Sequence, residues 1–263
     1  QRLFAGELSL DGKLKSTAGV LAMAVLASDS GFKEIIVPLS NAKEAASLNK
    51  VEVIGAENLS QVISHLNRTS VISPTPADVE DRSAGYYDSF ISIKGQEYAK
   101  RALIVAAAGS HNVFMSGPPG AGKTLLARAI TDILPPLVFD EAVEVAKIYS
   151  AVGLIDGKTP FSLQRPFRSP HLTTSAVAVV GGGTWPKPGE ISLAHRGVLF
   201  LDELPEFPRN VLESLRQPLE DGMVTISRAT GSVKMPAKFM LVAAMNPCPC
   251  GNYGSQTNEC ICM

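Results

Sequence analysis

Residues 117–124 have the sequence GPPGAGKT and match the phosphate-binding pattern G-x-x-x-x-G-K-[ST] at every fixed position. An apolar stretch precedes them and an amphipathic helical pattern follows, which is the context that such a loop requires. Its glycines let backbone N–H groups turn toward a β-phosphate, while Lys123 adds positive charge and Thr124 offers a hydroxyl to Mg²⁺. The residues expected to bind ATP are Gly117, Pro118, Pro119, Gly120, Ala121, Gly122, Lys123, Thr124 and Leu125.

A pair of carboxylates follows a second apolar stretch. Residues 198–201 (VLFL) have the uninterrupted apolar pattern of a buried parallel strand, and Asp202 and Glu203 come directly after them. A carboxylate at the end of such a strand can hold Mg²⁺ opposite Thr124, and we assign this role to Asp202. Glu203 is then placed to polarise the attacking water. The alternative is that Asp202 only caps the helix that follows.

An asparagine ends a third apolar stretch, residues 239–245 (FMLVAAM). If this strand joins the same sheet, the amide of Asn246 can bond the γ-phosphate or align the attacking water. Asn246 also precedes Pro247, and an Asn–Pro pair commonly starts a turn. Three strand ends at one edge predict hydrolysis at the carboxyl side of a parallel sheet. The predicted catalytic residues are Lys123, Asp202, Glu203 and Asn246.

The chain that must position these residues is 263 residues long, with 45% hydrophobic and 19% charged residues and a formal net charge of −1. This composition is that of a globular protein and excludes a disordered, collagen-like or disulfide-framework chain. The longest apolar run, residues 18–27, is too short to cross a bilayer as a helix. Because the phosphate motif needs cytosolic nucleotide, we predict a cytoplasmic protein with no membrane partner.

Two sections of the chain predict two α/β domains. Residues 1–72 alternate short strands and helices, and residues 73–89, which contain prolines, acids and small polar residues, form the expected linker. Residues 90–263 form the second domain. The expected strands are 3–10, 35–37, 51–54, 112–116, 198–201 and 239–245. The expected helices are 17–28, 41–48, 59–66, 96–108 and 123–134.

A family resemblance runs through most of the second domain. It is carried by residues 93–103 (IKGQEYAKRAL), 106–124, 165–171 (RPFRSPH), 180–207 and 241–247 (LVAAMNP). These stretches resemble the magnesium-chelatase-like AAA+ ATPases of the ComM/YifB type. The resemblance implies an α/β fold: a P-loop three-layer αβα core with a parallel sheet, preceded by a smaller, partial α/β domain. It also implies an adenine contact for Ile93, with simple core packing as the alternative.

Residues 4–26 (FAGELSLDGKLKSTAGVLAMAVL) are similar to the C-terminal part of a Lon-protease-like domain, which this family carries at its N-terminus. Lon proteases use a Ser–Lys dyad, and Leu21 stands where the lysine would fall. Leucine cannot activate a serine, so we expect a non-proteolytic domain.

The resemblance further implies a homohexamer with ATP bound between neighbouring subunits. An arginine from the next subunit, in a motif after the Asn246 strand, completes each site in the family. Because the chain starts at Gln1 and stops at Met263 before any such motif or helical lid, we expect a fragment. Loss of a trans arginine costs about 10³–10⁵ in rate, so we expect this chain to bind nucleotide but hydrolyse it poorly.

Two segments of the second domain are rich in basic residues and could bind the substrate of the ATPase. Residues 157–197 are rich in Gly and Pro, are expected to be mostly loop, and carry more basic than acidic residues. Residues 223–238 predict a β-hairpin with basic residues and no acid. Arg228 and Lys234 are therefore candidate nucleic-acid contacts lining a ring pore. A solvated charged surface is the alternative.

The resemblance to ComM-type proteins favours DNA, because it implies an ATP-driven helicase that promotes branch migration in natural transformation. The competing function is a chelatase-like protein-remodelling ATPase that drives a metal-inserting partner and does not bind DNA.

All four cysteines lie near the end of the chain, in the pattern C-P-C-x₉-C-x-C. Four cysteines can close a tetrahedral zinc site, although C-x-C pairs are less usual than C-x-x-C pairs. Disulfides are not expected in a cytosolic ATPase. The candidate Zn²⁺ ligands are Cys248, Cys250, Cys260 and Cys262, and free thiols are the alternative.

Overall fold

The computed structural model describes residues 1–77, 88–155, 162–183, 186–228, 231–254 and 259–262. The chain divides into two compact units. The first contains Gln1–Arg82 and Val138–Leu163, and the second contains Ser83–Leu137 and Gln164–Met263. Every helix among the described residues is too short or too polar to traverse a lipid bilayer.

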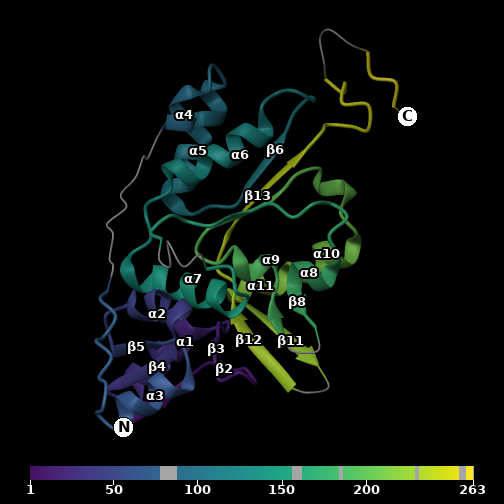
Figure 1. Cartoon of the computed structure of the whole chain (residues 1–263). Helices are drawn as coiled ribbons and strands as arrows, with labels where there is room; N and C mark the ends of the chain where they lie inside the picture. The colour runs from purple at the N-terminus through teal and green to yellow at the C-terminus, as the bar shows by residue number, and fades with distance from the viewer. Residues whose placement is uncertain (78–87, 156–161, 184–185, 229–230, 255–258, 263) are drawn as a thin grey trace. The chain divides into compact units, whose positions relative to one another are not determined.

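The first unit is built on a three-stranded sheet in the order β1-β4-β5, with all neighbours parallel (Figure 1). Side chains of β4 alternate between its two faces. Ile35 and Val37 are buried with α1 and α2, whereas Ile36 is buried with Val62 of α3. The elements are β1 (Arg2–Phe4), β2 (Glu7–Leu8), β3 (Leu14–Lys15), α1 (Val20–Asp29), β4 (Glu34–Pro38), α2 (Leu39–Ala46), β5 (Glu52–Ala56) and α3 (Leu59–Leu66).

Helix α7 (Phe139–Ala151) also packs in the first unit, although it follows the phosphate motif in the sequence. Val143 of α7 lies in one buried cluster with Leu21 and Val25 of α1. The Ser150 hydroxyl donates to Glu44 Oε1 over 2.5 Å and accepts from the backbone N–H of Leu21 over 3.3 Å. The amino-acid sequence does not predict that α7 packs in the first unit, because an apolar helix face does not indicate which unit will cover it.

The second unit is built on a four-stranded parallel sheet in the order β6-β13-β10-β7. Figure 1 shows β6 and β13 running side by side. The elements of this unit are α4 (Asp88–Ser92), α5 (Glu97–Gly109), β6 (Val113–Ser116), α6 (Lys123–Ile133), β7 (Phe167–Arg168), α8 (Ala176–Val180), β8 (Gly181–Gly182), β9 (Lys187–Pro188), α9 (Glu190–Leu193), β10 (Val198–Leu201), η1 (Leu204–Glu206), α10 (Arg209–Ser214), α11 (Arg216–Asp221), β11 (Met223–Arg228), β12 (Gly231–Pro236) and β13 (Met240–Met245).

Alternating side chains of β10 divide the second unit into three layers. Val198 and Phe200 are buried in a cluster with residues of α5 and α6. Leu199 and Leu201 are buried in a second cluster with residues of α8, α9 and α10. All four side chains are at most 1% exposed. Helices therefore cover both faces of the sheet, which confirms the α/β three-layer fold predicted from the sequence.

Residues 162–197 contain more regular structure than the expected loop. They form β7, α8, β8, β9 and α9. The β8–β9 pair and the β11–β12 hairpin are both antiparallel. A Cβ on Gly181 would lie 2.6 Å from Cδ1 of Ile226, so β8 packs tightly against β11.

Candidate nucleotide-binding site

The ends of three neighbouring strands meet at one edge of the second unit's sheet. Ser116 pairs with Met245, and Leu201 pairs with Ala243. Because these strands are parallel, the residues that follow them emerge on the same side. The phosphate loop, Asn246 and the Asp202–Glu203 pair are thereby brought together, as expected from the sequence.

The backbone of the phosphate loop depends on its glycines. Gly120 and Gly122 have φ values of 76° and 83°, in the left-handed region that side chains other than glycine rarely adopt. Gly122 is also the N-cap of α6, and its carbonyl accepts from the N–H of Leu126 over 2.9 Å. The loop therefore leads directly into a helix N-terminus, where unpaired N–H groups favour an anion.

The ammonium group of Lys123 spans the mouth of this loop. Its Nζ donates to the carbonyl oxygens of Gly117 over 2.7 Å and Pro118 over 3.0 Å, and to Oδ1 of Asn246 over 3.1 Å. All three partners are oxygen acceptors, the atom type that phosphate would present to the same group. The structure thus joins Lys123 and Asn246 although 123 positions separate them in the sequence.

A second contact joins the loop to the end of β10. Thr124 Oγ1 donates to Oδ2 of Asp202 over 2.7 Å, while Asp202 Oδ1 accepts from the backbone N–H of Glu203 over 3.0 Å. The helical turn that follows, η1, has Glu203 rather than Asp202 as its N-cap residue. A hydroxyl and a carboxylate in contact are a hard-oxygen pair of the kind that Mg²⁺ prefers, so these residues fit the ion.

Glu203 is exposed and its backbone is held at φ 52°, an unfavourable value for a residue with a side chain. It lines a pocket of about 430 Å³ together with Asn246, Leu172, Pro205 and Cys248. Strained backbone at such a position aims a side chain at the cost of local stability. Here Glu203 and Asn246 line the same pocket.

Two other predicted nucleotide contacts lie on either side of the loop. Leu125, on α6, is 64% exposed. Ile93 is partly buried against the cluster that contains Leu103 and Phe200. Gln96, which the sequence did not single out, also contacts the phosphate loop. Its backbone has φ 57°, and its Nε2 donates to the carbonyl of Ala121 over 3.3 Å. The only indication in the sequence is that Gln96 lies three residues after Ile93, the predicted adenine contact.

Some basic residues of the candidate DNA-binding segments are exposed, and others are bound within the second unit. Lys234 is exposed on β12, whereas the side chain of Arg228 lies outside the described residues. In the preceding segment, Arg168 makes a two-bond ion pair with Glu190 at 2.6 and 2.7 Å. Arg165 donates to the backbone carbonyls of Pro135 and Arg196. Arg165 and Arg168 therefore stabilise the fold of the second unit, and neither is offered as a DNA contact.

The four cysteines lie together just beyond β13, each half-buried. Hydrogen bonds from the backbone of Asn252 and then of Ile261 lower the pKa of the Cys250 thiol to about 6.

Comparisons with known proteins show what this chain is similar to. The family model described as "Magnesium chelatase, subunit ChlI" matches residues 89–263, and a model described as "Subunit ChlI of Mg-chelatase" matches residues 1–41. Competence protein ComM of Haemophilus influenzae is 46% identical over 97% of this chain and 51% of its own length. YifB of Escherichia coli is 45% identical over 97% of this chain and 50% of its own length. This chain thus spans about half the length of these relatives.

Among solved structures, one that describes the complex between subunits BchI and BchD of magnesium chelatase from cryo-EM matches this chain. The match covers 60% of this chain and 55% of the chain in that structure. The identity is 29% and the TM-score is 0.48.

Proposed function

This chain belongs to the magnesium chelatase (subunit ChlI) family of AAA+ proteins, of the ComM/YifB type, and from this premise we propose that it binds and hydrolyses ATP with Mg²⁺. The observation that carries the proposal is the pair of contacts across the sheet edge. Lys123 meets Asn246 and Thr124 meets Asp202, so residues from three strand ends form one site. If the glycine-rich turn matched the motif only by chance, there would be no reason for its Lys123 and Thr124 to contact Asn246 and Asp202.

Each residue has a distinct proposed role in hydrolysis. The loop N–H groups and Lys123 bind the β- and γ-phosphates, and Thr124 and Asp202 hold Mg²⁺. When bound, the ion supplies positive charge that neutralises the phosphate oxygens. Glu203 accepts the proton of the attacking water, and Asn246 orients that water or bonds the γ-phosphate. Ile93 contacts the adenine.

Binding of a fluorescent ATP analogue to this chain, with Mg²⁺ present, tests the first step. We expect Lys123→Ala to weaken binding by more than about tenfold, which equals roughly 1.4 kcal/mol. Lys43→Ala is the matched control, because Lys43 is an exposed lysine on α2 of the first unit. Equal affinity of Lys123→Ala and the unaltered chain would refute the proposal.

We further propose that the complete protein is a homohexameric, cytoplasmic DNA motor acting in natural transformation. Support comes from the ComM relative, whose name assigns it to competence, and from the basic hairpin. Residues 223–238 contain no acid, and Lys234 and Lys238 are exposed. Arg228 and Lys234 are the proposed contacts with phosphates of single-stranded or branched DNA.

The test is ATP turnover by the complete protein with and without forked DNA, together with DNA affinity as a function of salt. We expect DNA to stimulate turnover, and replacing Arg228 and Lys234 by Ala to flatten the log–log salt slope by about 2. The Lys43→Ala variant serves as the control. Salt-independent affinity and unstimulated turnover would instead favour a chelatase-like ATPase that remodels a protein partner.

For the domains, we propose that residues 1–72 are the C-terminal part of a Lon-protease-like domain without peptidase activity, joined by residues 73–89 to an AAA+ domain over 90–263. Leu21, at the position of the Lon lysine, is 0% exposed and lies in an apolar cluster with Val143 and Ala146. The leucine side chain has no group that could activate a serine. Casein hydrolysis that depends on residues 1–72 would contradict this proposal.

A further inference from the structure

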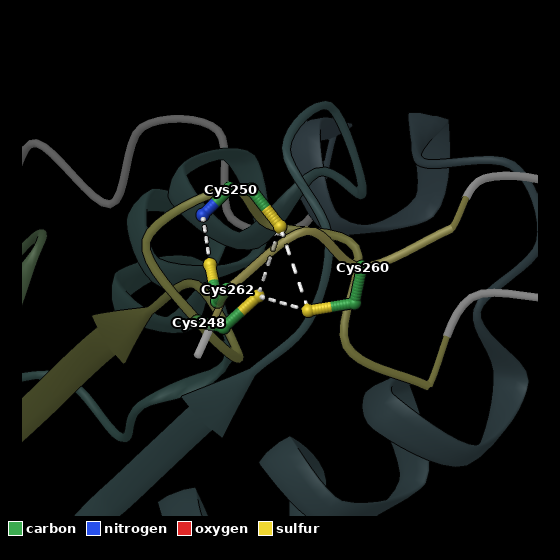
Figure 2. Close-up of side chains that lie close together, drawn as sticks. All are labelled: Cys248, Cys250, Cys260 and Cys262. Carbon is green, nitrogen blue, oxygen red and sulfur yellow. Dashed lines mark hydrogen bonds between the residues drawn. The ribbon is translucent and has the colours of Figure 1, made fainter.

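The four cysteines converge from two short segments. Cys248 and Cys250 follow β13 directly, and Cys260 and Cys262 return to them from further along the chain. Figure 2 shows the sulfurs of Cys248, Cys250 and Cys260 facing one another, while the Cys262 sulfur lies beside them and faces the backbone nitrogen of Cys250. All four Sγ atoms lie within 4.8 Å of one another.

The distances among the sulfurs of Cys248, Cys250 and Cys260 fit ligands of a single metal ion and are too long for a disulfide. Cys248 Sγ lies 3.4 Å from Cys250 Sγ and 3.7 Å from Cys260 Sγ, and the last two sulfurs are 3.6 Å apart. A disulfide needs an S–S distance of about 2.05 Å. Zinc–sulfur bonds of about 2.3 Å place tetrahedral ligands about 3.8 Å apart, close to the observed edges.

Backbone N–H groups surround the sulfurs. The N–H of Cys250 donates to Cys262 Sγ over 3.3 Å, and that of Tyr253 donates to Cys248 Sγ over 3.2 Å. Such bonds stabilise negative charge on sulfur and orient metal ligands. The described part of this segment also contains no helix or strand that would otherwise hold the two pairs together.

The cysteine loop is seated on the phosphate loop. Gly251, with φ 79°, approaches Pro119 so closely that a Cβ on it would lie 2.6 Å from the Cδ atom of the proline ring. At its other end, Cys248 is separated from Asn246 only by Pro247, and both line the pocket that contains Glu203. Whatever fixes the cysteine loop therefore also limits the motion of the phosphate loop.

We propose that Cys248, Cys250, Cys260 and Cys262 bind one structural Zn²⁺, and that the zinc-bound loop braces the phosphate-binding loop through Gly251 and Pro119. Each thiol releases its proton to solvent as its sulfur binds the ion. Zinc takes no part in hydrolysis. It replaces the regular structure that the segment lacks by closing the loop between the two cysteine pairs.

Metal content tests the first half of the proposal. Protein purified under reducing conditions, without added metal, should contain close to one zinc per chain by elemental analysis. The double variant Cys260→Ser, Cys262→Ser should lose it. Absence of zinc from the unaltered protein, iron in its place, or zinc retained by the double variant would overturn the site.

Hydrogen exchange tests the second half without any nucleotide. In the zinc-free double variant, the hydrogen-bonded amides of Gly117 and Ala121 should exchange about tenfold faster or more, equal to roughly 1.4 kcal/mol less protection. Amides of β5, in the other unit, should be unchanged. Gly251→Ala, which keeps all four ligands, should keep zinc and speed exchange in the same loop. Unchanged exchange in both variants would overturn the brace, and because the readout needs no ATP, it is independent of whether the proposed ATPase stands.

Discussion

Glu203 is one of the described residues with a side chain whose backbone lies in the left-handed region. It follows a buried strand, adopts φ 52°, and points an exposed carboxylate toward a pocket that Asn246 also lines. A left-handed backbone at a residue with a side chain costs free energy, so the surrounding structure must hold it there. The preceding side chain helps, because Asp202 Oδ1 accepts from the Glu203 N–H.

If this carboxylate accepts the proton of the attacking water, Glu203→Gln separates binding from hydrolysis. We expect ATP turnover by the complete protein to fall by about 10²–10⁴, because the amide keeps the shape but cannot act as a base. Affinity for the fluorescent ATP analogue should not change. Phosphate release and equilibrium binding measure the two effects.

Glu206→Gln is the control for this substitution, since Glu206 lines the same pocket from η1. We expect it to keep most of the turnover. Equal losses in both variants would mean that the charge of the pocket, rather than one base, supports hydrolysis.

At the scale of elements, strand β10 contributes buried side chains to the apolar clusters on both faces of the sheet in the second unit. Phe200 is 1% exposed, and its ring stacks on that of Phe167 with centroids 5.9 Å apart. Strand β6, at the edge of the same sheet and separated from β10 by β13, offers a contrast, because its Phe114 is 56% exposed. The two phenylalanines differ in burial but belong to one sheet.

We expect Phe200→Ala to lower the free energy of unfolding by about 3–5 kcal/mol, because it leaves a cavity between β10 and the helices above it. Phe114→Ala should change it by no more than about 0.5 kcal/mol. Urea denaturation followed by circular dichroism compares the two. Similar losses for both would indicate that the cluster does not stabilise the sheet.

The elements that set the phosphate site were the easiest to predict. Apolar runs bounded by glycine, proline or carboxylates predicted β10 with its exact bounds as found, and α6 began at Lys123 as expected. Placing parallel strand ends at one edge predicted that Thr124 and Asp202 lie opposite each other, as they do, and that Asn246 lies at the same edge. The hydrogen bond between Lys123 and Asn246 was not predicted.

Other features left no readable signal in the sequence. The strands β7, β8 and β9 each contain two residues, less than the alternation needed to recognise a strand. Nothing in residue types distinguishes a charged loop arginine from one that, like Arg168, is bound in an ion pair. The packing partner of α7 was equally hidden, because periodicity marks an apolar face without naming what covers it.

At the scale of the whole molecule, the first unit depends on a helix from another part of the chain. Without α7, the apolar face formed by Leu21, Val25 and Leu48 would be uncovered, and the Glu44 carboxylate would lose the Ser150 hydroxyl. Uncovered apolar surface and the loss of a hydrogen bond to a buried carboxylate both destabilise a small domain.

A chain of residues 1–77 alone should therefore unfold without a cooperative thermal transition. Adding a peptide of residues 138–155 should restore one, because it supplies α7 and its Ser150. Circular dichroism melting curves measure this, with a scrambled peptide as the control. A cooperative transition in residues 1–77 that the peptide leaves unchanged would show that the first unit is complete without α7.

The chain passes from one unit to the other at Arg82–Ser83, Leu137–Val138 and Leu163–Gln164. On the ribosome, the N-terminal unit must wait until α7 has emerged, and by then the whole phosphate loop has been synthesised. Each unit is made of two separate stretches of the chain, so no single continuous segment contains one whole unit without part of the other.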